Sequence, residues 1–287
     1  MAGETIDEAI EAVRVLNAKG MNATLDLLGE DVGNPSEARK SAETIREALE
    51  RIDQTRVRSN VSIKLSQIGL AIDEQLCEEY LVAILQRAAE LGTFVRIDME
   101  DSPRVDATLR IFRKMRDAHG FDNVGVVIQS YLYRSEKDTQ ELLNTKTCIR
   151  VVKGAYKEPP EVAFPKKSDV DQCFDELTRM LLDAAANSDL GLSEDGKFPP
   201  LAAIATHDEN RVESAKRYTA STGLAFERLE FQMLYGIRRK LQTRLAEEGY
   251  PVRIYVPFGT EWYPYFMRRL AERPANLWFF LTSLFSN

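Results

Sequence analysis

The sequence contains few of the residues that build metal centres and disulfide frameworks. It has three cysteines, Cys77, Cys148 and Cys173, and two histidines, His119 and His207, among 287 residues. No C-x-x-C or H-E-x-x-H spacing occurs, and two histidines cannot complete a typical zinc site. An odd number of cysteines favours reduced thiols over a disulfide framework. We therefore predict a protein without a metal, located in the cytoplasm.

A net positive charge and nucleotide-binding glycine motifs are absent as well. The formal net charge is −7, whereas a broad nucleic-acid surface needs a basic face, so we expect no nucleic-acid partner. The sequence has no G-x-G-x-x-G after a strand, no P-loop and no G-x-S-x-G. These absences argue against a Rossmann nucleotide site, a P-loop site and a nucleophile elbow.

Long hydrophobic runs are missing as well. The most apolar stretch, LWFFLTSLF near the C-terminus, is about half of the ~20 residues that a membrane span needs. Two interpretations stay open for it: a helix that packs on the core, and a peripheral contact with the inner face of a membrane. The N-terminus, MAGETIDEAIEAV, is acidic and amphipathic and does not resemble a signal peptide.

What the sequence does contain is an alternating pattern of strands and helices. Short β-branched, apolar runs begin at positions 23, 61, 94, 124, 148, 201, 229 and 252. Helical patterns occupy 35–52, 73–92, 102–120, 135–144, 169–187, 208–221, 236–248 and 260–285. Eight strands that alternate with helices predict an α/β fold, a (β/α)8 TIM barrel, formed as a single domain over residues 1–287.

Polar side chains stand at the predicted carboxyl ends of all eight strands, where barrel enzymes carry their active sites. They are Asp26, Glu30, Lys64, Ser66, Asp98, Glu100, Gln129, Ser130, Arg150, Lys153, Thr206, His207, Glu230, Gln232 and Tyr255. Singly, each has an ordinary structural explanation, such as a helix-cap partner or a lysine that reaches from the barrel to solvent. Together they predict a mouth that binds a small acid and an organic cofactor.

The mouth alone leaves more than one function open. A class I aldolase would use Lys153 as its Schiff-base lysine and Asp98 as the acid–base partner. A catalytically inactive barrel that only binds a ligand is a third possibility. The proline-rich segment 157–169 follows the fifth strand and is a candidate lid or cofactor cover. The segment 188–200, rich in glycine, proline and serine, is expected to be an exposed loop.

Two arginine pairs differ in their surroundings. In WYPYFMRRLAERPAN, residues 262–276, Arg268 and Arg269 lie among aromatic residues, and burying them there requires an anion. Arg238 and Arg239, in IRRKLQ, form a second pair and are expected on a solvated helix face.

The segment YPYFMRRLAER resembles the signature of the proline dehydrogenase family, Tyr-x-x-Arg-Arg-x-x-Glu. Its residues are Tyr265, Arg268, Arg269 and Glu272. Further segments resemble that family in the same order: SIKLSQIG, RIDMED, RVVKGAY, ATHDENRV, LEFQMLYG and RIYVPFG. The chain is similar to the bacterial monofunctional form, which is related to the proline dehydrogenase domain of proline utilization A.

The resemblance implies a fold, a cofactor and a reaction. The fold is a distorted barrel whose last helix lies over the barrel mouth. The cofactor is non-covalently bound FAD. The reaction is the oxidation of L-proline to Δ1-pyrroline-5-carboxylate, the first step of proline degradation to glutamate, with a membrane quinone as the electron acceptor.

The resemblance also implies roles for individual residues. Asp98 and Arg150 are the expected catalytic residues. The substrate residues are Lys64, Tyr255, Tyr265, Arg268, Arg269 and Glu272, with the arginine pair and Lys64 binding the carboxylate of L-proline. The cofactor residues are Met99, Gln129, Arg150, Lys153, Gly154, Ala155, Thr206 and His207.

Overall fold

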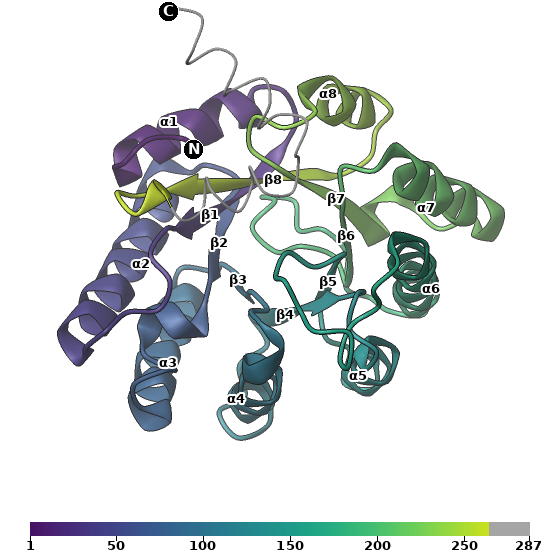
Figure 1. Ribbon diagram of the computed structural model, residues 1–287. Coiled ribbons are helices and arrows are strands. Elements are labelled where there is room, and N and C mark those ends of the chain that lie inside the picture. The colour runs from purple at the N-terminus through teal and green to yellow at the C-terminus, as the bar shows by residue number, and fades with distance from the viewer. Residues whose placement is uncertain (264–287) are drawn as a thin grey trace, which may run out of the picture.

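A computed structural model describes residues 1–263, and these residues form a closed barrel of eight parallel strands (Figure 1). Each strand pairs with its neighbours in chain order, and β8 pairs with β1 to close the ring. The strands are β1 (Asn22–Leu27), β2 (Ser59–Ile63), β3 (Val95–Ile97), β4 (Val124–Gln129), β5 (Ile149–Val152), β6 (Ala202–Ala205), β7 (Leu229–Leu234) and β8 (Val252–Phe258). All eight strands expected from the sequence are therefore confirmed.

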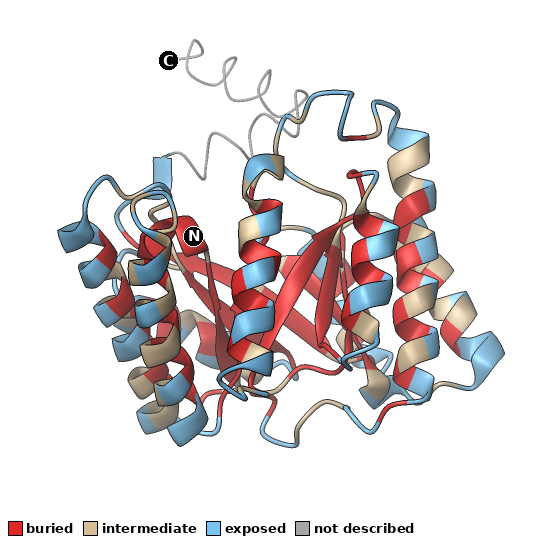
Figure 2. Cartoon of the chain, turned by 90° about the horizontal axis from the view of Figure 1, so that it is seen from below, coloured by how far each residue is buried: buried red, intermediate tan, exposed pale blue. Residues whose placement is uncertain are grey.

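Helices surround the barrel. They are α1 (Ile6–Asn17), α2 (Pro35–Thr55), α3 (Glu74–Glu90), α4 (Val105–Asp117), α5 (Ser135–Leu143), α6 (Lys167–Ala186), α7 (Glu209–Thr222) and α8 (Arg239–Glu247), with short 3₁₀ turns η1 (Leu65–Ile68), η2 (Ser102–Arg104) and η3 (Phe226–Arg228). Figure 2 shows buried residues on the helix sides that face the strands and exposed residues on the outer sides. This amphipathic arrangement packs the helices onto the apolar outer wall of the barrel.

Side-chain caps fix where several helices begin. Asn34 accepts hydrogen bonds from the backbone N–H groups of Ser36 and Glu37, and Pro35 occupies the first turn of α2. Asp73 caps α3 in the same way through the N–H groups of Gln75 and Leu76. These starts follow from local chemistry that is visible in the sequence.

Helix α1 was not expected from the sequence. Thr5 and Glu8 form a reciprocal capping box at its start, so the T-x-x-E spacing is the signal that was missed. The helix packs against β1, β8 and α2. It therefore covers the outer wall between β8 and β1, where a regular barrel would place the helix that follows β8. The expected helix 260–285 over the mouth falls almost entirely outside the described residues.

The barrel interior is polar. Inward-facing positions alternate along each strand, and among the described residues they include Thr24, Ser62, Arg96, Arg150 and Gln232, all of which are buried. A large arginine fits at position 96 because Gly125 stands beside it on β4. A Cβ at position 125 would lie 2.7 Å from Arg96 Nη1 and 2.4 Å from the carbonyl oxygen of Cys148.

The segment 188–200 is not the exposed loop that its composition suggests. Its second half is buried, with Lys197 only 8% exposed, and Phe198 packs edge-on against Phe94. The carbonyl oxygen of Gly196 accepts a hydrogen bond from Nη2 of Arg253, the second residue of β8. The segment thus covers the amino-terminal end of the barrel, opposite the mouth.

Candidate active site

Four side chains meet inside the mouth of the barrel: Lys64 and Asp98 directly follow β2 and β3, and Arg150 and Tyr255 lie within β5 and β8. Asp98 Oδ1 accepts from Arg150 Nη1 at 2.6 Å, and Asp98 Oδ2 accepts from the Tyr255 hydroxyl at 2.7 Å. Lys64 Nζ donates to that hydroxyl at 3.2 Å and lies 3.7 Å from Asp98 Oδ2. The arrangement agrees with the proximity expected from the sequence, since the ends of parallel strands meet at one edge of a barrel.

Two further carboxylates face Lys64. Its Nζ lies 2.9 Å from Asp26 Oδ1 and 3.6 Å from Glu30 Oε1. Burial opposes the charge on Lys64, but Asp26, Asp98 and Glu30 outweigh that effect and raise the lysine pKa. Burial also raises the pKa of Asp26 to about 6, an effect to which Asp98 adds and which Lys64 opposes. Asp26 was only one of many rim residues in the sequence, and nothing there marked it as the partner of Lys64.

Arg150 is fixed by three hydrogen bonds, one from each guanidinium nitrogen. Nη1 donates to Asp98, Nη2 donates to Ser62 Oγ at 3.0 Å, and Nε donates to Gln232 Oε1 at 2.5 Å. A guanidinium has five N–H groups. Two of those of Arg150 are therefore without a hydrogen-bond acceptor among residues 1–263 and can donate to a bound molecule.

The hydrogen bonds continue from Arg150 towards the amino-terminal end of the barrel. Gln232 Nε2 donates to Glu230 Oε1 at 2.6 Å, and Arg253 Nε donates to the same oxygen at 2.8 Å. We call the series Asp98, Arg150, Gln232, Glu230 and Arg253 the polar column. Glu230 was expected at the mouth. That expectation is wrong: Glu230 is the second residue of β7 and is fully buried against Arg253, below Gln232.

Arg96 adds a buried positive charge beside this column. Its Nη1 donates to the carbonyl oxygens of Val126 and Cys148, and no carboxylate pairs with it among the described residues. Burial, together with the nearby charge of Arg150, lowers the pKa of Arg96 to about 9. Nothing in the sequence pattern indicates that this strand residue points inward.

The expected cofactor residues outside the column lie on the same edge. Met99 is buried directly after Asp98. Gln129 Nε2 donates to the carbonyl oxygen of Glu100 at 2.8 Å. Thr206 Oγ1 accepts from the N–H of Asp208 at 3.1 Å, and His207 Nε2 accepts from the N–H of Leu234 at 2.9 Å.

The turn after β5 carries Lys153, Gly154 and Ala155. Lys153 Nζ donates to Asp208 Oδ2 at 2.6 Å and also to Asp171. A Schiff-base lysine needs a neutral amine, so this pairing does not favour the aldolase alternative. Gly154 has φ +118°, and a Cβ there would lie 2.6 Å from the ring of Tyr131. Glycine is therefore required by both backbone conformation and space.

The loop between β5 and α6 lies over the neighbouring loops of the mouth. Glu158 accepts from the N–H and the hydroxyl of Ser102, at 2.7 and 2.5 Å, and from the Tyr131 hydroxyl at 3.3 Å. An isolated bridge joins Leu132 to Ala163. This position agrees with the expectation of a cover for 157–169, whose role remains a prediction.

Six further residues singled out in the sequence are not part of the described site. Tyr265, Arg268, Arg269 and Glu272 lie outside the described residues. Arg238 and Arg239 are exposed, as expected, although Arg238 precedes α8 in a left-handed conformation and pairs with Glu209 at 2.7 Å.

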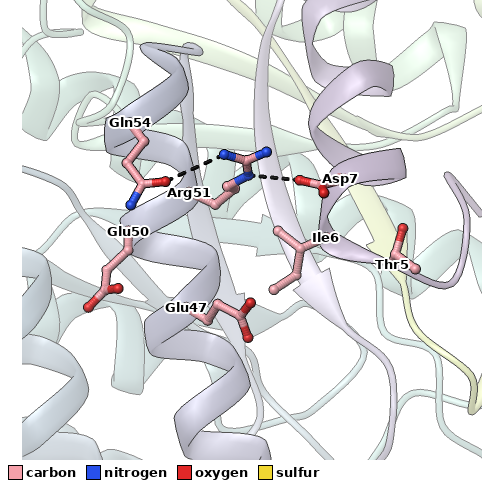
Figure 3. A pocket seen from close by; sticks show the side chains of 7 residues that line it. All are labelled: Thr5, Ile6, Asp7, Glu47, Glu50, Arg51 and Gln54. Atoms are coloured by element: carbon pink, nitrogen blue, oxygen red, sulfur yellow. Dashed lines mark hydrogen bonds and ion pairs between the residues drawn. The ribbon is translucent and has the colours of Figure 1, made fainter.

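A surface pocket of about 500 Å³ lies between α1 and α2, away from this edge of the barrel (Figure 3). Its Arg51 points between Asp7, at 2.7 Å, and Gln54, at 3.5 Å. No group of three or more potential metal-ligating side chains occurs in residues 1–263. Within the same residues, no helix has the length and apolar character to cross a bilayer.

The raised pKa of Asp26 leads to a pH-dependent stability. The folded protein holds the Asp26 proton more tightly than the unfolded chain, whose pKa is near 3.8. This stabilisation is complete below that value and is lost as the pH rises through about 6. Roughly 2 pKa units correspond to about 3 kcal/mol. Asp171 and Asp208 have lowered pKa values, so their stabilisation is lost only at lower pH.

We expect Asp26→Asn to remove this dependence. Urea unfolding of the parent should give a free energy of unfolding that falls between about pH 4 and pH 7 relative to that of the variant. Two parallel pH curves would contradict the protonation of Asp26 in this range.

Comparison with known proteins gives a consistent result. The family model of proline dehydrogenase matches residues 9–280. Proline dehydrogenase 1 of Bacillus subtilis is 42% identical over 284 residues, which is 99% of this chain and 89% of that protein. Proline dehydrogenase of Deinococcus radiodurans is 42% identical over 279 residues, 96% of this chain and 86% of that protein.

A solved structure shares the fold. Proline utilization A (PutA) from Bdellovibrio bacteriovorus, inactivated by N-propargylglycine, aligns with a TM-score of 0.85 and 25% identity. The alignment covers 95% of this chain but only 32% of that longer chain.

Proposed function

Because the chain belongs to the proline dehydrogenase family of oxidoreductases, we propose that it oxidises L-proline to Δ1-pyrroline-5-carboxylate with FAD. Electrons then pass to a membrane quinone, which requires at least a transient contact with the inner face of the membrane. The observation that carries the proposal is the cluster of Lys64, Asp98, Arg150 and Tyr255 inside the mouth of the barrel. We further propose that residues 1–287 form one domain.

The charges of the cluster suit an amino acid. Asp26, Glu30 and Asp98 supply three negative charges, and Lys64 and Arg150 supply two positive charges, so the ionised cluster carries a net charge of −1. A net negative charge favours binding of the amine end of the substrate at this cluster, rather than its carboxylate. The substrate carboxylate then needs cations from elsewhere, and Arg268 and Arg269 are the proposed source, with Tyr265 and Glu272 holding them in place.

The position of α1 supports placing the two arginines over the barrel mouth. Because α1 occupies the outer wall between β8 and β1, the chain after Phe258 has no free place on that wall. We propose that the last helix lies over the mouth, where both arginines can reach the substrate carboxylate.

The residues at the mouth fit a flavin. Arg150 has two N–H groups that can donate to the flavin ring, which gains electron density on reduction. Gly154 has no side chain, so the backbone there can approach the bulky flavin closely. We propose Met99, Gln129, Lys153, Ala155, Thr206 and His207 as further contacts. When bound, FAD supplies the hydride acceptor. The chain orients proline, with Lys64 and Tyr255 beside the substrate ring, and Asp98 holds Arg150 in place.

We expect purified protein to carry a flavin absorbance band that L-proline bleaches under anaerobic conditions. Arg150→Met should slow the bleaching and lower the flavin midpoint potential, because a nearby cation favours the reduced cofactor. Turnover should require a quinone as electron acceptor.

A colourless protein that gains no activity with added FAD would contradict the proposal. Covalent trapping of a substrate on Lys153 by borohydride would instead indicate the Schiff-base chemistry of an aldolase.

A further inference from the structure

The side chain of Gln232 bridges two groups of opposite hydrogen-bonding character. Its Oε1 accepts from Arg150 Nε at 2.5 Å, and its Nε2 donates to Glu230 Oε1 at 2.6 Å. The residue is 3% exposed, so no bulk water competes for either contact. Gln232 comes from β7, whereas Arg150 comes from β5 across the barrel interior.

The chemistry of the neighbours requires a side chain that both accepts and donates at this position, and the amide of Gln232 does so. Arg150 can only donate, and the ionised carboxylate of Glu230 can only accept. A residue between them must therefore accept on one side and donate on the other. This requirement also fixes the amide orientation, because a flipped amide would place N–H against N–H and oxygen against oxygen.

Glu230 is itself immobile. Both Glu230 and Arg253 have side chains with 0% exposure, and Arg253 also donates to the carbonyl oxygens of Ala23 and Gly196 at 2.8 Å. Gln232 is thus anchored from below by an ion pair tied to the backbone of β1 and of the segment 188–200.

We infer that Gln232 is a positioning residue that holds the guanidinium of Arg150 by its Nε edge. In this orientation Nη1 and Nη2 remain directed at Asp98, Ser62 and the molecule bound at the mouth. The inference rests on the proposed role of Arg150 beside the flavin. It assigns the orientation of Arg150 to an amide whose own hydrogen bonds go to Arg150 and Glu230.

The first test replaces the amide by an apolar group of similar length. Gln232→Met should slow anaerobic flavin reduction by L-proline by about tenfold to a hundredfold, which is the typical effect of a misplaced catalytic group. The flavin midpoint potential should fall, while the KM for L-proline should change little. A residue that only filled space would leave the potential unchanged.

The second test uses pH. Gln232→Glu places a carboxylate against Glu230, and the protonated form of the new carboxyl can still donate to Glu230 and accept from Arg150. Other charged groups around the position are Asp98 and Arg96 from β3, Arg150 from β5 and Arg253 from β8. Repulsion between two carboxylates raises one pKa. The rate of this variant relative to the parent should therefore recover as the pH is lowered, and that of Gln232→Met should not.

A matched control is Gln242→Met. Gln242 is also 3% exposed, but its Nε2 donates to the backbone carbonyls of Leu234 and Ile237 outside the barrel interior. This variant should keep the parental flavin potential and reduction rate.

The double variant Arg150→Met, Gln232→Met completes the experiment. Because Gln232 acts through Arg150, the double variant should be no slower than Arg150→Met alone. If Arg150→Met is slow and Gln232→Met keeps the parental rate and potential, the inference is wrong while the role of Arg150 stands. If Arg150→Met itself has no effect, both fail. Should Gln232→Met yield no folded protein, the pH response of Gln232→Glu decides.

Discussion

Asp98→Asn is expected to lower kcat/KM for L-proline by roughly 10²–10³-fold while the barrel stays folded. The carboxylate accepts from both Arg150 and the Tyr255 hydroxyl and faces Lys64. Asparagine has nearly the same shape, but its NH2 group would face one of these donors. Its neutral amide also leaves Arg150 without a counter-charge beside the buried cation of Arg96. Steady-state kinetics with flavin content measured in parallel tests this.

Asp138→Asn is the matched control for that experiment. Asp138 is a buried aspartate, 4% exposed, and it accepts from Arg134 at 2.6 and 3.3 Å. It lies on α5, outside the barrel interior. The control should keep parental kcat/KM. If both variants keep it, the cluster around Asp98 has no part in the reaction.

Glu230→Leu is expected to reduce the free energy of unfolding by about 3–5 kcal/mol. Glu230 and Arg253 form an ion pair in which neither side chain is exposed. Removal of the carboxylate leaves the guanidinium in the barrel with only the carbonyl oxygens of Ala23 and Gly196 as acceptors. Urea unfolding of the two proteins provides the measurement.

Two further measurements serve as controls for the Glu230→Leu result. Replacing both Glu230 and Arg253 by leucine should cost less than the sum of the two single replacements, because no charge is left unpaired. Arg110→Leu breaks an exposed pair with Glu74 at 2.6 Å and should cost less than about 1 kcal/mol. Equal losses in Glu230→Leu and Arg110→Leu would contradict the importance of burial.

The sequence predicts the barrel well because its strands are short, β-branched runs and its helices carry clear caps. The proximity of Lys64 and Asp98 follows from the same logic, since parallel strands end at one edge. Arg150 and Tyr255 lie within their strands and reach the other two from inside the barrel. How deep an inward-facing side chain lies in the barrel does not follow from the sequence pattern. It depends on strand tilt and register, which pairing between distant strands determines. Glu230 and Gln232 lie on the same face of β7, but Gln232 contacts Arg150 whereas Glu230 lies deeper and contacts Arg253.

Two other errors have local causes. Residues 188–200 have the composition of a surface loop, but composition does not reveal that Arg253 needs the carbonyl oxygen of Gly196 as an acceptor. The capping box of Thr5 and Glu8 was readable. A helix before the first strand is not part of the repeating strand–helix pattern, so that pattern does not predict it.

The pairing of β1 with β8 has a consequence for the synthesis of the protein. The two ends of the described chain are joined there: the N–H of Ala2 donates to the carbonyl oxygen of Pro257, and that of Gly259 donates to Gly3. On a ribosome, the edge of β1 therefore stays unpaired until β8 has left the exit tunnel. Contacts this distant in sequence form slowly, and an unpaired strand edge invites association with other chains. During translation the nascent sheet therefore keeps an open edge on β1 until β8 can pair with it.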